Sequence, residues 1–146
     1  IEEAKRKKIK INIFHNASII EGVTESGLQI YKFGKIASLP KWDREKNFRP
    51  TSFIEIVKEN LSIGAHTILL IDIGLSLKDA LEELETSANK YGLKLDKILI
   101  CERLGVKSKF YYDIIENLKN KKMQEPFCII IPGKMNFKEK DSLDGI

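Results

Sequence analysis

Three nearly continuous apolar runs limit what this chain can fold into more than any other feature of the sequence. They occupy residues 67–73 (TILLIDI), 97–101 (KILIC) and 127–131 (FCIII). Short runs of this kind, rich in Ile and Leu, are typical of strands that are covered on both faces of a sheet. We therefore expect buried strands at these three places.

Amphipathic segments alternate with the apolar runs and predict helices. One helix is expected between Ser52 and Gly64 and a clearer one between Ser76 and Gly92, each with a serine that can cap its start and a glycine that ends it. Another helix is expected at residues 111–118, where apolar side chains recur at helical spacing.

Two weaker strand patterns complete the predicted sheet. Residues 9–15 (IKINIFH) alternate apolar and polar side chains, and residues 36–39 form a shorter candidate. Together with the helices they predict an α/β fold, in which a mixed sheet of about five strands has helices packed against it. The pattern does not fix the strand order. Because the chain has 146 residues and neither a repeat nor a Gly/Ser linker, residues 1–146 are expected to form one domain.

Composition and charge exclude several classes of protein. Hydrophobic residues make up 42% of the chain, which is too apolar for a disordered protein, and no apolar run approaches the roughly 18 residues of a membrane span. The net charge of +4 comes from lysine-rich stretches at residues 5–10 and 119–122. A nucleic-acid site normally combines such a patch with a readable motif or stacking aromatics. We interpret both stretches as solvated charge and expect no direct contact with nucleic acid.

The cysteines and histidines are isolated from one another. Cys101 and Cys128 cannot form a disulfide framework, and no His/Cys spacing indicates zinc, so no metal site is expected. Both thiols lie in apolar runs and are expected to be buried and inert. His15 and His66 each stand alone beside an apolar run, which favours core or strand-end positions over a catalytic base or a metal ligand.

Candidate functional residues lie where predicted strands end. Ser18 and Glu21 form a capping-box pattern after residues 9–15, and a helix start there would offer backbone N–H groups to a carboxylate or phosphate. Asp72 and Glu102 close apolar runs, at positions where polar groups often border a ligand crevice. A simple helix cap explains Ser18 more readily, and ordinary strand-end contacts explain Asp72 and Glu102 as well as a crevice does.

Five segments of the chain resemble one known family. They are HNASI at 15–19, IYKFG at 30–34, FRPTSFIEIVKEN at 48–60, AHTILLIDI at 65–73 and IIIPGKM at 129–135. In this order they resemble the diphthine synthase family, methyltransferases of the diphthamide pathway that have a tetrapyrrole-methylase-like fold. The resemblance covers nearly the whole chain. It implies that residues 1–146 are the carboxyl-terminal domain of such an enzyme and that the amino-terminal domain is absent from this chain.

The resemblance also implies a cofactor site. In the family, S-adenosyl-L-methionine lies between two domains, so this chain would supply one wall. By position, the cofactor contacts correspond to Ser18, Ile19, Ile71, Leu104 and Phe127. Phe127 replaces a histidine that is usual in the family, and phenylalanine cannot donate a hydrogen bond. Glu102 replaces a small residue of the family pattern.

The function implied by the resemblance is S-adenosylmethionine-dependent methylation of the modified histidine of translation elongation factor 2. Such an enzyme is expected to be cytoplasmic and homodimeric, with no membrane partner, and to be inactive as this chain alone. Methyl transfer from a sulfonium depends on placement and exclusion of water, so no catalytic residue is assigned. Two alternatives stay open: a non-catalytic binding or dimerisation module of the same fold, and a methylase of a tetrapyrrole substrate.

Overall fold

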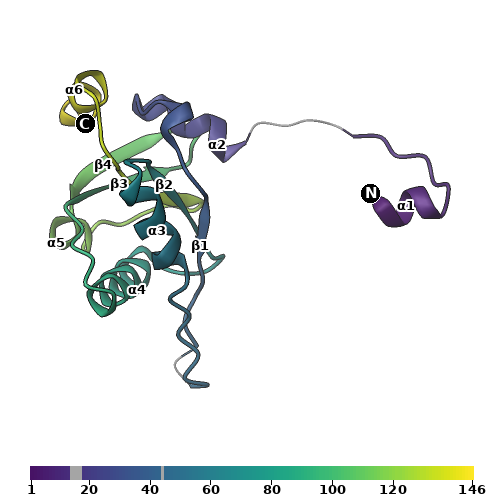
Figure 1. Cartoon of the computed structure of the whole chain (residues 1–146), viewed down its shortest axis with the longest axis horizontal. Coiled ribbons are helices and arrows are strands. Elements are labelled where there is room, and N and C mark those ends of the chain that lie inside the picture. The colour runs from purple at the N-terminus through teal and green to yellow at the C-terminus, as the bar shows by residue number, and fades with distance from the viewer. Residues whose placement is uncertain (14–17, 44) are drawn as a thin grey trace.

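The computed structural model describes residues 1–13, 18–43 and 45–146. Its centre is a mixed sheet with the strand order β1-β2-β5-β3-β4 (Figure 1). The strands are β1 (Ala37–Leu39), β2 (Thr67–Ile71), β3 (Lys97–Glu102), β4 (Lys109–Ile114) and β5 (Phe127–Ile131). β1 and β2 are parallel, whereas the other neighbours are antiparallel. The predicted mixed sheet of about five strands is confirmed.

The two longest helices, α3 (Phe53–Ser62) and α4 (Leu77–Lys90), occupy the segments in which helices were predicted. Ser76 caps α4 by accepting from the Asp79 N–H, whereas Ser52 makes no side-chain cap, so the predicted cap of α3 is wrong. The shorter elements are α1 (Glu2–Arg6), α2 (Ile19–Gly22), η1 (Val23–Ser26), η2 (Ile30–Lys32), α5 (Ile115–Leu118) and α6 (Phe137–Asp144). No helix in the described ranges is long and apolar enough to cross a membrane.

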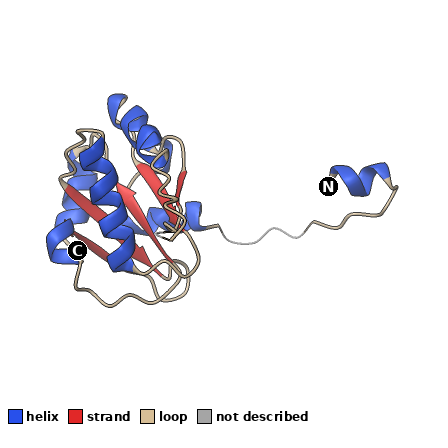
Figure 2. Cartoon of the chain, turned by 90° about the horizontal axis from the view of Figure 1, so that it is seen from below, coloured by secondary structure: helices blue, strands red, loops and turns tan. Residues whose placement is uncertain are grey.

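Both faces of the sheet are covered, as the apolar runs predicted, and helices lie on both sides of the strands in Figure 2. On one face, Leu69, Ile100 and Ile129 belong to a buried cluster with side chains of α3 and α4. On the other face, Ile68 and Leu99 belong to a second cluster with side chains of η1 and α6. Burial on both faces explains why these strands contain almost no polar residue.

The strand predicted at residues 9–15 is wrong for residues 9–13, which pair with no strand, and residues 14 and 15 lie outside the described residues. Ile9 and Ile13 are 58% and 61% exposed, so their alternating pattern has no core to face. The lysine-rich stretch at residues 5–10 is exposed throughout, in agreement with solvated charge.

β4 (Lys109–Ile114) includes residues 111–114, the first half of the helix predicted at 111–118, so that prediction is wrong for these four residues. The sequence KFYYDI pairs with β3 along its whole length, from Lys109 opposite Glu102 to Ile114 opposite Lys97. Aromatic side chains favour strands, and here this preference prevails over the helical spacing of the apolar residues. Only α5, directly after β4, follows the helical pattern.

The strand directions bring three strand ends together. β1, β2 and β3 point the same way, because β1 is parallel to β2 and both β2 and β3 are antiparallel to β5. Their last residues, Leu39, Ile71 and Glu102, therefore lie at the same end of the sheet as Phe127, the first residue of β5. We call this end the strand-end rim and the other end the opposite rim.

Candidate functional site

Backbone hydrogen bonds tie the loops of the strand-end rim to one another. The Asp72 N–H donates to Leu39 O over 3.2 Å, and the Arg103 N–H donates to Pro126 O over 2.9 Å. These bonds continue the sheet ladder beyond its last paired residues. The rim is therefore a fixed support on which side chains from separate loops meet.

A cavity of about 350 Å³ lies at this rim, on the face of the sheet covered by η1 and α6. Three of the five predicted cofactor residues, Ser18, Ile19 and Leu104, line it although they are far apart in the sequence. The complete lining consists of Ser18, Ile19, Glu21, Gly22, Thr24, Glu25, Cys101, Leu104, Gly105 and Pro126. We call this cavity the α2 cavity.

Ser18 fixes the start of α2 beside this cavity. Its Oγ accepts a hydrogen bond from the Ile20 N–H at 3.2 Å, so the predicted cap is confirmed but the predicted capping box with Glu21 is not the arrangement that forms. Glu21 and Glu25 line the cavity instead, and neither carboxylate forms an ion pair within the described part of the chain. Two carboxylates without a basic partner favour a ligand that carries positive charge.

Gly22 allows α2 to lie directly against the loop after β3. A Cβ atom at Gly22 would stand 3.0 Å from Leu104 Cβ, which is closer than ordinary van der Waals contact. The missing side chain therefore sets the distance between α2 and Leu104, which face the same cavity.

Cys101 also lines the α2 cavity, and its cross-strand partner is Cys128. The two free thiols are 1% and 0% exposed, so their predicted burial is confirmed. The neighbouring Cys128 thiol and burial raise the pKa of Cys101, which favours the protonated, weakly nucleophilic form.

The other two predicted cofactor residues lie at the same rim but on the opposite face of the sheet. Ile71 and Phe127 line a smaller cavity of about 70 Å³, and both pack against the cluster that contains α4 side chains. Pro126 borders this cavity and the α2 cavity alike. The structure thus brings all five residues to one rim and divides them between its two faces.

The two departures from the family pattern are neighbours. Glu102 and Phe127 are directly opposite each other in the β3–β5 ladder. The Glu102 side chain is almost completely buried, and it accepts a hydrogen bond from Tyr111 Oη at 3.2 Å, with Lys109 Nζ at 3.8 Å. Burial and the Glu102 carboxylate raise the pKa of Tyr111. Glu102 is larger than the small residue of the family pattern, and β4 supplies the partners that accommodate its carboxylate.

The opposite rim contains a buried polar network. His66 is fully buried; its Nδ1 accepts a hydrogen bond from the Gly133 N–H at 2.8 Å, and its Nε2 lies 3.1 Å from Glu139 Oε1. Since Nδ1 is an acceptor, Nε2 carries the proton and donates to the carboxylate. Burial lowers the pKa of His66 and so favours the neutral ring. Glu139 also accepts from Lys32 Nζ at 2.5 Å.

Glu139 has enough donors to remain ionised in the interior. The backbone N–H groups of Gln29 and Asn136 donate to it at 3.1 and 2.9 Å. Burial alone would raise the pKa of Glu139, but Lys32, these two N–H groups and His66 outweigh burial and lower the pKa to about 2. Asn136 and Glu139 also form the capping box of α6, so the network fixes α6 to the sheet.

Three of the family-like segments therefore meet in a structural network. Lys32 belongs to IYKFG, His66 to AHTILLIDI and Gly133 to IIIPGKM. The prediction that His66 is a core or strand-end residue is confirmed, but its partners were not anticipated. The spacing of Asn136 and Glu139 is the sequence signal that could have located α6 and its buried carboxylate.

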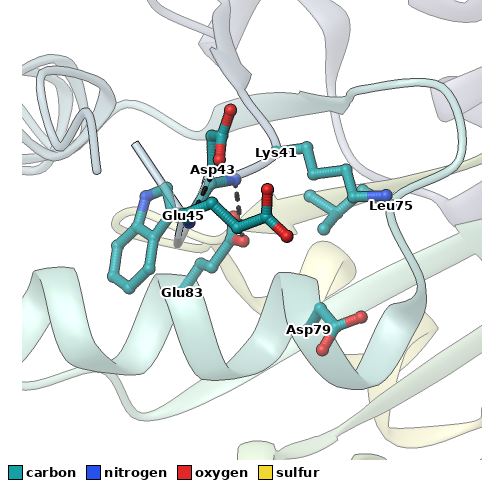
Figure 3. Close-up of a pocket in the computed structure, with 7 residues that line it drawn as sticks. Lys41, Asp43, Glu45, Leu75, Asp79 and Glu83 are labelled. Atoms are coloured by element: carbon teal, nitrogen blue, oxygen red, sulfur yellow. Dashed lines mark hydrogen bonds between the residues drawn. The ribbon is translucent and has the colours of Figure 1, made fainter. Parts of the chain in front are cut away.

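A third cavity, of about 450 Å³, lies between the loop after β1 and helix α4 (Figure 3). Figure 3 shows Lys41, Asp43 and Glu45 on the loop above Asp79 and Glu83 of the helix. The loop is held there because the Trp42 N–H donates to Glu83 Oε1 at 3.0 Å. None of the five predicted cofactor residues lines this cavity.

Comparisons with known proteins agree with the resemblance, although no protein-family model matches the chain. Diphthine synthase of Methanocaldococcus jannaschii is 37% identical over 155 aligned positions, which cover 97% of this chain and 60% of the relative. Diphthine methyl ester synthase of Schizosaccharomyces pombe is 47% identical over 70 positions, covering 48% of this chain and 24% of the relative. A crystal structure of diphthine synthase superposes with a TM-score of 0.84 at 30% identity and covers 99% of this chain and 57% of that structure.

The chain thus spans about 60% of the length of the first of these relatives. Its α/β fold is the fold of the diphthine synthase structure, and the match fits the carboxyl-terminal portion of such a protein.

Proposed function

Because the chain is homologous to diphthine synthases over nearly its whole length, we propose that it is the carboxyl-terminal domain of a methyltransferase of this kind. The proposed reaction is methylation of the modified histidine of translation elongation factor 2, with S-adenosyl-L-methionine as the methyl donor. The observation that supports the proposal most is the α2 cavity, in which three residues chosen from the family pattern line one space.

The α2 cavity suits S-adenosylmethionine in size and charge. Its volume of about 350 Å³ lies within the range of small-molecule sites. Ile19, Leu104 and Pro126 offer apolar surface to a flat base, whereas the carboxylates of Glu21 and Glu25 suit a ligand with a positive sulfonium. The residues present therefore fit the proposed cofactor.

The bound cofactor would supply an activated methyl group on a positively charged sulfur. The contribution of this chain is then placement of the ligand and exclusion of water, neither of which needs a nucleophilic side chain. The cap at Ser18 fixes one wall, and the close approach of Gly22 to Leu104 fixes the width of the cavity. Ile71 and Phe127 would extend the wall beyond Pro126. No residue is proposed as the general base.

In this proposal the chain forms one wall of a site whose second wall comes from sequence that these 146 residues do not contain. Ordered sites bury roughly 70–90% of a ligand of this size, so the chain alone should bind the cofactor weakly and transfer no methyl group. A cytoplasmic location, a homodimer and elongation factor 2 as the protein partner belong to the same proposal.

Calorimetry with S-adenosylmethionine tests the proposal. The 146-residue chain should bind weakly, and the same chain joined to the part of the Methanocaldococcus jannaschii relative that it does not cover should bind in the micromolar range. Leu104→Asp in the joined protein should abolish that binding, whereas Val106→Asp, at a 74% exposed position of the same loop, should leave it unchanged.

A methyl-transfer assay on the joined protein completes the test. Elongation factor 2 that carries the modified histidine should be methylated, and a tetrapyrrole offered as the control substrate should not. Methylation of the tetrapyrrole, or no cofactor binding by a joined protein whose circular dichroism shows it to be folded, would contradict the proposal. Micromolar binding by the chain alone would show that one wall is sufficient.

A further inference from the structure

β4 is an edge strand whose outer side has no partner in the described part of the chain. It pairs with β3 only, and the strand order ends at β4. It is six residues long, whereas β1 at the other edge has three. A long edge strand presents backbone N–H and C=O groups that another strand can pair with.

The ladder of β3 determines which groups of β4 point outward. Because the Arg103 N–H donates to Pro126 O, odd-numbered residues at this end of β3 direct their backbone groups toward β5. In an antiparallel ladder the direction alternates, so Ile100 directs its groups toward β4. Tyr111, which is opposite Ile100, therefore bonds inward, and its neighbours Phe110 and Tyr112 direct their backbone groups outward.

The sequence of β4 is complementary to itself when two copies run antiparallel. If Tyr111 lies opposite the partner's Tyr111, Lys109 lies opposite the partner's Asp113 and Phe110 opposite the partner's Tyr112. Each of these pairs then occurs twice. A shift of one residue would instead place Phe110 opposite the partner's Asp113, and both charge pairs would be lost.

The side chains that this pairing needs are at least partly exposed. The Asp113 carboxylate already accepts hydrogen bonds from the Ile114 N–H at 2.8 Å and from Asn117 Nδ2 at 2.9 Å, so the ion pair would add to these bonds. The Lys109 side chain is 58% exposed, and its contact with Glu102 is long, at 3.8 Å. Residues 110–113 are all half-buried, with no fully buried residue among them. Lys121 Nζ lies 4.6 Å from the centre of the Tyr111 ring and so packs over a ring face. Opposite charges and aromatic side chains directly across from each other stabilise a pair of strands.

We propose that two copies of this chain associate through antiparallel pairing of their β4 strands, with Tyr111 on the two-fold axis. Phe110 and the partner's Tyr112 form the backbone-bonded pairs, and Lys109 and the partner's Asp113 form an ion pair at each end. One sheet then continues through both copies. This inference depends on the sheet edge and not on the proposed methyl transfer, and it assigns a surface to the proposed homodimer.

Analytical ultracentrifugation of the 146-residue chain tests the pairing. The parent chain should dimerise as its concentration rises. Lys109→Asp and Asp113→Lys each place like charges opposite one another at both ends of the junction, and each should weaken dimerisation at least about tenfold. Lys107→Asp, at an exposed position before β4, changes the net charge by the same amount as Lys109→Asp and should have no effect.

Mixing the two variants separates loss of pairing from loss of folding, because unfolded chains would not regain dimerisation when mixed. The Lys109→Asp chain and the Asp113→Lys chain carry opposite charges across the junction only in a heterodimer, so the mixture should dimerise about as well as the parent. A chain that carries both Lys109→Asp and Asp113→Lys should dimerise like the parent for the same reason. A parent chain that stays monomeric, single variants that dimerise like the parent, or a mixture of folded variants that forms no heterodimer would each overturn the proposal. None of these readouts depends on cofactor binding.

Discussion

The buried network of the opposite rim and the α2 cavity of the strand-end rim use their carboxylates in opposite ways. At the opposite rim Glu139 is fully buried and has four donors, namely Lys32, His66 and two backbone N–H groups. At the strand-end rim Glu21 and Glu25 line a cavity and have no basic partner in the described chain. The network therefore stabilises the fold, whereas the two glutamates of the α2 cavity have no basic partner within the described part of the fold to stabilise.

Glu139→Ala should lower the free energy of unfolding more than the other substitutions, because it disrupts the buried network of the opposite rim. It removes the common acceptor of Lys32 and His66, and loss of a buried charged partner costs about 3–5 kcal/mol of unfolding free energy. Urea denaturation measures this loss. Glu59→Ala is the matched control, because Glu59 forms an exposed ion pair with Lys35, and it should cost less than about 1 kcal/mol. Equal losses for the two variants would contradict the distinction between the rims.

Low pH should destabilise the Glu139 network of the opposite rim. The pKa of Glu139 is about 2 in the fold, against an ordinary value of 4.5. Since the folded pKa is the lower one, the carboxylate stabilises the fold fully above about pH 4.5, and this contribution, on the order of 3 kcal/mol, is lost as the pH falls toward 2. Urea denaturation across this range should give a flatter profile for Glu139→Gln than for the parent chain. Parallel profiles would show that Glu139 does not carry the effect.

Phe127→His should increase cofactor affinity at the strand-end rim, because histidine restores a hydrogen-bond donor. One neutral hydrogen bond contributes about 0.5–1.5 kcal/mol, so cofactor affinity in the joined protein should rise about threefold to tenfold. Calorimetry measures the change. Phe137→His, at a 71% exposed position on α6, is the control and should leave affinity unchanged. Unchanged affinity for both variants would mean that position 127 does not face the ligand.

Gly22→Ala should have the smallest effect on the fold. Alanine is favoured over glycine in a helix by up to about 1 kcal/mol, which offsets the crowding of Leu104. The unfolding free energy should therefore change by less than about 1 kcal/mol, while the narrower cavity lowers cofactor affinity a few-fold. Gly145→Ala, after α6, is the control for binding. Affinity equal to that of the parent would show that the approach of α2 to Leu104 does not limit the site.

The parts of the fold that followed from sequence are those encoded locally. The runs at 67–73, 97–101 and 127–131 became β2, β3 and β5, because burial on both faces leaves a strong apolar signal. Residues 9–13 and 111–114 were misassigned, since a strand depends on a neighbour that local periodicity does not reveal. Strand order is non-local for the same reason.

The candidate site divides in a similar way. Ser18 and its helix cap were visible in the local pattern, and resemblance placed Leu104 beside it. The separation of Ile71 and Phe127 onto the other face follows from strand register, which only the folded chain defines. The partner of His66 was missed because Glu139 lies far along the sequence.

The last strand of the sheet to be synthesised lies in its middle, because β5 separates β2 from β3. Until residues 127–131 have left the ribosome, only the β1–β2 and β3–β4 pairs can form. Each pair then exposes the backbone edge that β5 later bonds, and such late non-local pairing makes folding slow and open to aggregation. A nascent chain interrupted before residue 127 would consist of two strand pairs with nothing to join them, and it would depend on chaperones to stay in solution.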